Sequence, residues 1–302
     1  MLNMRRLSIT LISALTVLPL VGANPAQASA PASVISTIDA SNATRSPSCA
    51  TATAFDPRNF SRSTVIDNQW LPLRPGMQFT FDGTTTDDEG TVIPRRVVLT
   101  ITDLTKVING VRTVVLWDRD FSDGQLIESE LAFQAQDNTG SVWNLGEYPE
   151  EYEKNKFVGA PSTWIAGLNQ AKAGIHMLAQ PRVGTPEYLQ GSAPDIDFLD
   201  CGKVSQTGIR VCTKLACYNN VLVVDERSPL EPDSGIQRKF YAPGVGNIKI
   251  TAVDDPEGET LELVGVVRLN SKDLATARKA ALKLEKRAYK VSDVYSQTPP
   301  AS

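Results

Sequence analysis

Histidine is almost missing from this sequence: His176 is the only one in 302 residues. A catalytic zinc ion is usually held by two or three imidazole or thiolate ligands, so most zinc enzymes are excluded. A Ser-His-Asp hydrolase would have to use His176 as its base, and no G-x-S-x-G turn accompanies it. A histidine without a catalytic role is the more common interpretation, but His176 lies beside Met177 in an aromatic segment and stays a candidate site residue.

An excess of positive charge is also missing. The chain has 30 Lys and Arg against 34 Asp and Glu, which gives a net charge of −4. Nucleic-acid binding needs a concentrated basic surface, so nucleic acid is excluded as a partner. Beyond the first thirty residues there is no long apolar run, so we expect no transmembrane span in the mature chain.

The first thirty residues resemble an export signal. Arg5 and Arg6 precede an apolar stretch over 7–23, and Ala26-Gln27-Ala28 forms a small-x-small cleavage site. We therefore predict a signal peptide over 1–28 and a periplasmic or extracellular location. Residues 29–61 are rich in Ala, Ser, Thr and Pro and are typical of a flexible leader.

Cysteine is scarce but even in number. An even number in an exported chain predicts two disulfides, for which three pairings are open. No C-x-x-C pair is present, so a metal site is disfavoured and we expect no cofactor. The four residues are Cys49, Cys201, Cys212 and Cys217.

Residues 62–270 show the period-two alternation of β-strands. Asn109-Gly110 and Asp123-Gly124 are strong hairpin signals, and Thr207-Gly208 is expected to be a further turn. Ten or eleven strands follow one another with no helix between them. The predicted fold is mainly β: an antiparallel meander that forms a curved sheet, barrel or half-barrel, with one C-terminal helix.

Two intervals depart from this alternation. Residues 146–184 are predicted to form a long, packed loop that covers the sheet. Residues 271–302 are predicted to form a basic helix over 271–291, with Ser271 as N-cap, and a loose tail. The basic face could contact an anionic surface, although packing on the sheet with that face in solvent is the more common arrangement.

Carboxylates are the remaining acid–base option. Glu147 and Glu151 are the first candidates for a catalytic pair, with His176 as a third catalytic candidate, and Glu128 and Glu130 share one strand face and could join them. The competing interpretation is a solvated acidic loop. Aromatic and sulfur-containing side chains could line a ligand groove or simply fill the core. The ligand-binding candidates are Trp143, Trp164, His176 and Met177.

Three motifs occur together: W-L-P-L-x-P-G over 70–76, A-Q-D-x-x-G-x-V-W over 135–143, and F-Y-A-P-G-V-G over 240–246. As a set they resemble an uncharacterised family of secreted bacterial β proteins, over about 65–269. The resemblance implies an exported bacterial β protein and carries no activity or site residue with it.

The sequence supports three functional hypotheses. The first is an exported, non-enzymatic protein that binds an apolar or amphiphilic ligand in a β-barrel-like cavity, under a cover formed by 147–177. The second is a carboxylate-dependent hydrolase or lyase that acts on an envelope or extracellular polymer. The third is a structural envelope protein.

Overall fold

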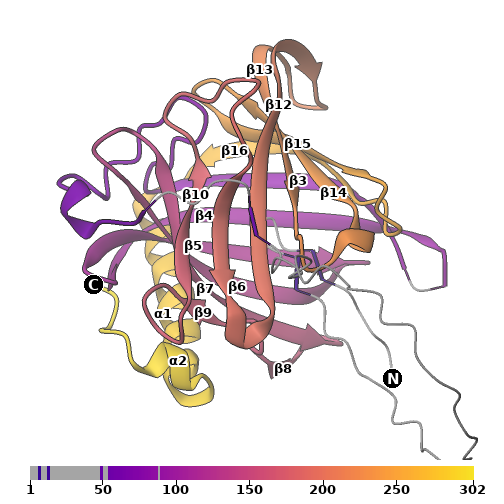
Figure 1. Ribbon diagram of the computed structural model, residues 1–302. Helices are drawn as coiled ribbons and strands as arrows, with labels where there is room; N and C mark the ends of the chain where they lie inside the picture. Colours follow the sequence, from indigo (N-terminus) through magenta and orange to yellow (C-terminus); the bar gives the residue numbers. More distant parts are fainter. Residues whose placement is uncertain (1–5, 8–11, 14–47, 50–53, 88) are drawn as a thin grey trace, which may run out of the picture.

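Twelve antiparallel strands close into a barrel in the computed structural model, which describes residues 6–7, 12–13, 48–49, 54–87 and 89–302 (Figure 1). The strand order is β10-β11-β12-β13-β14-β15-β16-β3-β4-β5-β6-β7, and β10 pairs with β7 to complete the ring. The predicted antiparallel barrel with one long C-terminal helix is confirmed. The barrel strands are β3 (Met77–Thr86), β4 (Val92–Ile108), β5 (Val111–Ser122), β6 (Gln125–Gln136), β7 (Val142–Glu153), β10 (Lys172–Met177), β11 (Tyr188–Ala193), β12 (Phe198–Cys212), β13 (Cys217–Arg227), β14 (Ile236–Ala242), β15 (Gly246–Val253) and β16 (Thr260–Arg268).

Smaller elements complete the structure. Strands β8 (Lys156–Gly159) and β9 (Trp164–Ile165) pair with β7, and β1 (Arg6–Leu7) pairs with β2 (Ile12–Ser13). The remaining elements are η1 (Pro57–Asn59), η2 (Pro194–Ile196), η3 (Pro232–Ser234), α1 (Ser271–Val291) and α2 (Asp293–Ser296). Most of the predicted signal peptide and leader, 1–28 and 29–61, lies outside the described residues.

The tight turns explain how successive strands become neighbours. Asn109 and Gly110 have φ values of 47° and 79°, and Asp123 and Gly124 have φ values of 47° and 72°. Positive φ at both central positions gives a two-residue turn whose twist matches the strands on either side. The hairpins β4–β5 and β5–β6 therefore form where the sequence predicted them.

The predicted long loop over 146–184 is wrong. These residues contain the second half of β7, then β8, β9 and β10, and β10 closes the barrel. The alternation is absent because nearly every residue of β7 is buried, on both faces of the strand. The interior covers one face, while other parts of the chain cover the outer one.

The predicted turn at Thr207-Gly208 is also wrong. Strand β12 runs through it to Cys212, and the ladder with β13 continues with three shifts of register, one of them between Gln206 and Ile209. Gly208 has a φ of 76°, which fits a β-bulge inside a continuous strand. The glycine in the strand pattern therefore indicated that the β-ladder is irregular here, but it did not distinguish a bulge within one strand from a turn between two strands.

Helix α1 lies on the outside of the barrel against β4 and β6 (Figure 1). Its buried stripe consists mainly of Ala277, Ala281, Leu284 and Ala288, so the helix can approach the sheet closely. Asn270, not Ser271, is the N-cap, because its side chain accepts a hydrogen bond from the Asp273 amide at 2.9 Å. The lysines of the opposite face are exposed, as predicted.

The segment 66–76, here called the cap segment, crosses one end of the barrel. The Asn68 side chain donates to the carbonyls of Gly140 and Leu178, and the Gly244 amide donates to the Gln69 carbonyl. These partners belong to the β6–β7 turn, the end of β10 and the β14–β15 turn. The cap segment is therefore tied to three points on the rim, and its apolar side chains, Trp70, Leu71 and Leu73, are buried.

Both predicted disulfides are present. Cys49 is bonded to Cys201 on β12, and Cys212 is bonded to Cys217 across the β12–β13 turn. The second bridge closes the tip of the hairpin that projects from the barrel in Figure 1. Among the described residues, no helix is both long enough and apolar enough to cross a membrane.

Candidate functional site

The inside of the barrel carries an unusual number of acidic side chains. Asp118 on β5 lies directly opposite Glu130 on β6, and Asp120 lies opposite Glu128. Glu128 is in turn opposite Glu151 on β7. Directly opposite residues of an antiparallel pair share one face of the sheet, so these five carboxyl groups lie on one interior wall. All five are buried.

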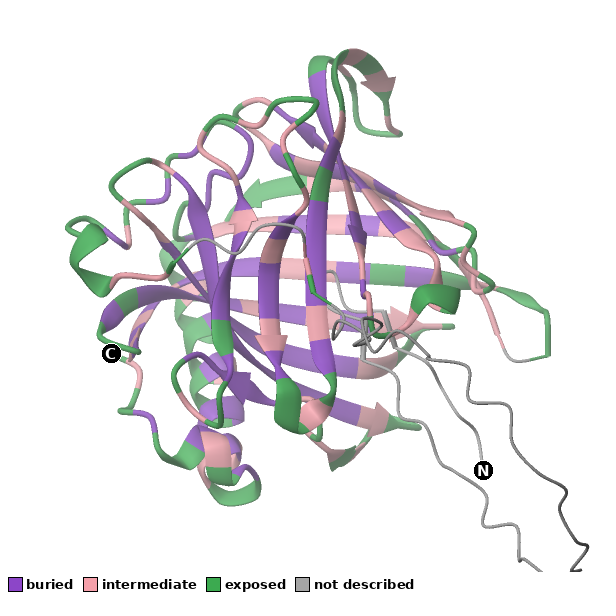
Figure 2. Ribbon diagram, viewed as in Figure 1, coloured by how far each residue is buried: buried purple, intermediate pink, exposed green. Residues whose placement is uncertain are grey.

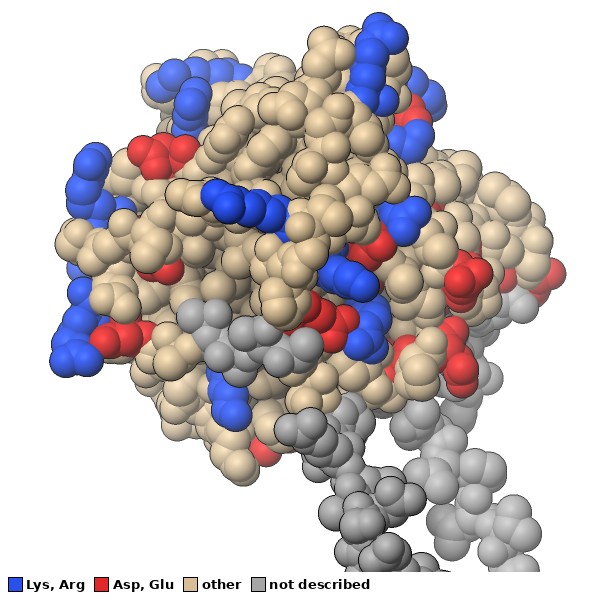
Figure 3. Space-filling model, turned by 45° about the horizontal axis from the view of Figure 1, so that its top comes forward, with Lys and Arg blue, Asp and Glu red and all other residues tan. Residues whose placement is uncertain are grey.

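Fewer buried basic groups are found beside these acids. The Arg95 guanidinium lies 3.0 Å from Glu259 and 3.1 Å from Asp120, and Lys239 lies 2.5 Å from Glu226. On the outer surface seen in Figure 3, by contrast, acidic and basic side chains are interspersed. The described part of the interior thus has an excess of carboxyl groups over basic groups. Its acids are Asp118, Asp120, Glu128, Glu130, Glu147, Glu151, Asp200, Glu226 and Glu259.

Burial raises the pKa values of several acids inside the barrel. It raises the pKa of Asp118 to about 7, with the Glu128 charge adding to the effect, and that of Glu147 to about 8. For Glu130 the pKa rises well above its usual value, first through burial and then through the charges of Glu147 and Glu128. A carboxyl group that loses water and faces other carboxylates favours the neutral form, so part of the wall is protonated at neutral pH.

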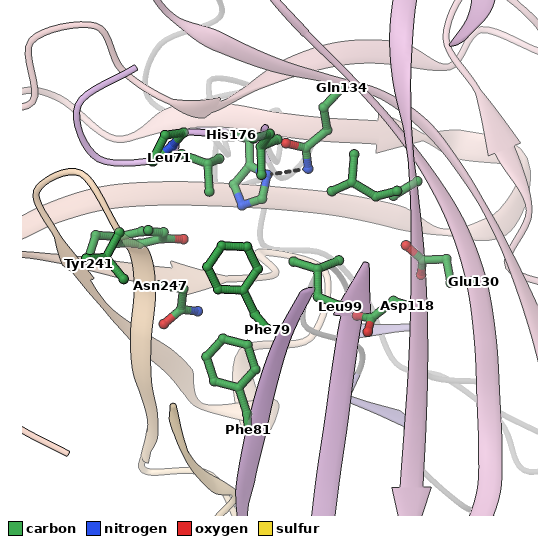
Figure 4. Close-up of a pocket in the computed structure, with 16 residues that line it drawn as sticks. Leu71, Phe79, Phe81, Leu99, Asp118, Glu130, Gln134, His176, Tyr241 and Asn247 are labelled. Atoms are coloured by element: carbon green, nitrogen blue, oxygen red, sulfur yellow. Dashed lines mark hydrogen bonds between the residues drawn. The ribbon is translucent and has the colours of Figure 1, made fainter. Parts of the chain in front are cut away.

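A cavity of about 40 Å³ lies between this acidic wall and the cap segment (Figure 4). Its apolar side is formed by cap residues Leu71 and Leu73 together with strand residues Phe79, Phe81, Leu99 and Leu116. Its polar side is formed by Asp118, Glu130, Gln134, His176, Tyr241 and Asn247. The accessible surface of the cavity is therefore mainly apolar, with a smaller polar part on one side.

His176 projects from β10 into the polar side of this cavity (Figure 4). Burial lowers the pKa of its imidazole to about 4, so the ring is neutral at neutral pH. The Gln134 side-chain amide donates to Nδ1 at 2.7 Å, which leaves the ring proton on Nε2. The Gln134 carbonyl oxygen is buried and has no hydrogen-bond partner within the described structure.

A second, smaller cavity lies on the other side of His176. It measures about 10 Å³ and is lined by Asn144, His176, Gln190, Phe198, Asp200 and Glu226. Among the described residues, the Gln190 carbonyl oxygen and the Asp200 Oδ1 have no hydrogen-bond partner. Such a space holds about one water molecule, which could donate to both oxygens.

The predicted ligand-binding residues do not gather in one place. Only His176 lines the two cavities. Trp143 faces the outside of the barrel, where it packs against Phe55 and Phe60 and donates its indole N–H to Asp137. Met177 is buried but lines neither cavity.

The remaining tryptophan candidate, Trp164, belongs to the core beside Glu147. Its indole N–H donates to Glu147 Oε2 at 3.1 Å, and its ring packs against Phe198. Trp164 lines neither cavity. Its role in the described structure is to fill the interior and to hold one carboxyl group.

The predicted acid pair lies inside the barrel but lines neither cavity. Glu147 is fully buried and accepts hydrogen bonds from Asn144 and Trp164, and Glu151 is opposite Glu128. The interpretation of this acidic stretch as a solvated loop is wrong, because these side chains are buried. Glu150 points to the outer side, where it pairs with Arg287 of α1.

Sequence reasoning missed Asp118 and Gln134 as cavity residues. The available signal was the alternation itself: Asp118 and Asp120 share one strand face, as do Glu128, Glu130 and Gln134. Polar residues at alternate positions usually indicate a solvated face, and only closure of the barrel turns that face inward. Among the described residues, no group of three or more His, Cys, Asp and Glu side chains is arranged so that it could hold a metal ion.

Comparisons with known proteins add little. No family model and no curated protein matches the chain. One similar solved structure is a protein of Bacteroides fragilis thought to be exported, with a YmcC-like fold: 13% identity, TM-score 0.39, covering 66% of this chain and 99% of that one. Another is a protein of Parabacteroides distasonis thought to be a lipoprotein: 10% identity, TM-score 0.35, covering 67% and 100%. At these TM-scores neither likeness carries a conclusion about this chain.

Proposed function

We propose that this protein is an exported, non-enzymatic binding protein that holds a small amphiphilic ligand inside its barrel, beneath the cap segment. Export rests on the sequence pattern of residues 1–28. Binding rests on the cavity, which offers two chemically different sides to one occupant.

The apolar side would hold the hydrocarbon part of the ligand. Phe79, Phe81 and Leu99 present apolar side chains to the cavity from β3 and β4, and Leu71 closes it from the cap segment. Burying apolar ligand surface against such side chains contributes about 25 cal/mol per Å². Ligand pockets typically combine such a lining with a few convergent polar groups.

The polar side would fix the orientation of the ligand. His176 carries its ring N–H on Nε2, and Gln134 has an acceptor oxygen without a partner in the described structure. A buried acceptor without a partner costs about 1–3 kcal/mol. A ligand that donates a hydrogen bond there would recover much of this cost.

The size of the cavity implies movement of the cap segment. About 40 Å³ holds roughly three water molecules. A larger ligand would enter by displacing the cap segment, which is attached to the rim through the Asn68 side chain and the Gln69 carbonyl. We therefore propose that the cap segment is the cover, in place of the 147–177 segment expected from the sequence.

Filling the cavity tests this function. Ala132→Val adds two carbon atoms at a position that lines the cavity. Native mass spectrometry of wild-type protein purified from its own secretory route is expected to show a bound small molecule. The valine variant should carry at most a tenth as much of it, with an unchanged or higher melting temperature.

The matched control is Ala252→Val, the same substitution on β15 at a position that lines neither cavity. It should retain the ligand. Repeated recovery of empty wild-type protein, or equal occupancy in the Ala132→Val variant, would contradict the proposal.

A further inference from the structure

The cavity holds two carboxyl groups in a geometry that suits one kind of ligand head group. Asp118 and Glu130 are directly opposite each other on β5 and β6, and both line the cavity. Interior side chains at such positions have Cβ atoms about 4.5–5.5 Å apart. Like charges directly opposite each other are destabilising, so this pair favours either a shared proton or a cation between its members.

The surroundings of the pair differ from those of the next pair along the strands. Asp120, one step further, is bonded to Arg95, so its negative charge has a partner. By contrast, the charged groups that act most strongly on Glu130 are all acidic: Glu147, Glu128, Asp118 and Asp120. Arg95 thus makes its ion pairs at the far rung of the ladder. Its charge and that of Arg119 also act on Asp118, whereas the charges that act most strongly on Glu130 are acidic.

A third group on the cavity wall points to the same ligand chemistry. The Gln134 side chain lines the cavity, and its carbonyl oxygen is buried and has no hydrogen-bond partner in the described structure. It is independent of the two carboxyl groups and needs a donor. A primary ammonium has three N–H donors and one positive charge, so it could serve two carboxylates and an amide oxygen together.

We infer that the ligand carries a protonated primary amine, which lies between Asp118 and Glu130 with its hydrocarbon part on the phenylalanine side of the cavity. This inference rests on the proposed function and names its ligand class: a cationic amphiphile. An alcohol could satisfy Gln134 but would leave the two acids facing each other. A carboxylate ligand would add a third negative charge.

Binding of the amine should be coupled to proton release. In the free protein burial raises the pKa of Asp118 to about 7, so this carboxyl group holds a proton below neutral pH, and burial raises the pKa of Glu130 as well. An ammonium favours their ionised forms and expels these protons. Affinity should therefore rise about tenfold per pH unit for each proton released below pH 7, and level off once the acids are ionised.

The other titratable groups that face the pair are Arg95 on β4, Asp120 on β5, Glu128 on β6, Glu147 on β7, His176 on β10 and Tyr241 on β14, with Arg119 next to Asp118 in the chain.

Titration calorimetry with three probes of equal chain length tests the inference. Hexylammonium is expected to bind the full-length exported protein at least tenfold more tightly than hexan-1-ol, and hexanoate more weakly still. Comparison of buffers with different ionisation enthalpies at pH 6 should show proton release on hexylammonium binding. Asp118→Asn and Glu130→Gln should each weaken hexylammonium at least tenfold and leave hexan-1-ol within about threefold.

Asp200→Asn is the matched control, because it removes an interior carboxyl group on β12 that does not line this cavity and is not among the charges that act most strongly on Asp118 or Glu130. It should keep hexylammonium affinity within about threefold. Equal affinity for hexan-1-ol and hexylammonium, or no loss in the Asp118→Asn and Glu130→Gln variants, would overturn the amine assignment while the binding function stands. Failure of all three probes, together with recovery of empty protein, would overturn both.

Discussion

Single buried charges hold parts of this molecule together. Lys106 on β4 is fully buried, and its ammonium donates to Glu285 of α1 at 2.8 Å, to the Tyr289 hydroxyl at 3.0 Å and to the Pro299 carbonyl at 2.6 Å. One side chain thus joins the barrel to the helix and to the C-terminal tail. The expected loose tail is tied down at this point.

Removing this ammonium should destabilise the fold strongly. Lys106→Met keeps the apolar stem but leaves the Glu285 carboxylate buried without its cation, which costs about 3–5 kcal/mol. Urea unfolding should report this loss of unfolding free energy. Lys290→Met, on the exposed side of α1, is the control and should change it by less than about 0.5 kcal/mol. Equal effects of the two substitutions would refute the role of Lys106.

At the scale of elements, the two disulfides constrain very different lengths of chain. Cys49–Cys201 joins residues 152 positions apart, whereas Cys212–Cys217 joins residues five positions apart. The first fixes Cys49, far upstream in the sequence, against the barrel wall at β12. The second closes only the tip of one hairpin.

Loop-closure entropy predicts unequal contributions from the two bridges. The double variant Cys49→Ala/Cys201→Ala should lose about 5 kcal/mol of unfolding free energy, and Cys212→Ala/Cys217→Ala about 2 kcal/mol. Chemical denaturation of both variants beside the wild type measures the difference. A larger loss for the short bridge would contradict this ordering.

At the scale of the whole molecule, the barrel concentrates acids in its interior and buries apolar residues on its outer wall as well. Figure 2 shows buried residues along the strands and exposed residues gathered in the turns. The interior therefore holds many buried acids, whereas the sequence predicted only a barrel-like cavity for an apolar or amphiphilic ligand. Burial raises the pKa values of Asp118 and Glu147 to about 7 and 8, which favours their neutral forms, and other interior acids pair with Arg95 or Lys239.

This arrangement makes stability depend on pH in a defined direction. Burial raises the pKa of Asp118 from 3.8 to about 7 and that of Glu147 from 4.5 to about 8, with Asp120, Glu130, Asp200 and Glu259 also raised. The folded state therefore binds more protons than the unfolded state between about pH 4 and pH 8. Stability from these groups is complete below the unfolded values and is lost as pH rises through the folded ones.

The urea midpoint should accordingly be higher at pH 5 than at pH 8.5. His176 acts in the opposite direction, because its lowered pKa of about 4 costs stability as pH falls below 6.5. It is a single group, whereas six buried acids have raised pKa values, so the acids set the direction of the pH dependence. Glu147→Gln should flatten the decline between pH 5 and pH 8.5. A midpoint that rises over this interval would show that the interior acids are ionised.

The antiparallel β class, the hairpins at Asn109-Gly110 and Asp123-Gly124 and the helix over 271–291 could all be predicted from the amino-acid sequence, because turn chemistry and periodicity act over a few residues. The sequence also carried the acids at alternate strand positions. The pairing of β10 with β7 is a long-range contact that becomes visible in the folded barrel, and closure of the barrel places the alternating acids of β5, β6 and β7 inside. Which face of a strand meets water depends on ring closure, a property that no local pattern encodes, and the candidate site lies on the face that closure buried.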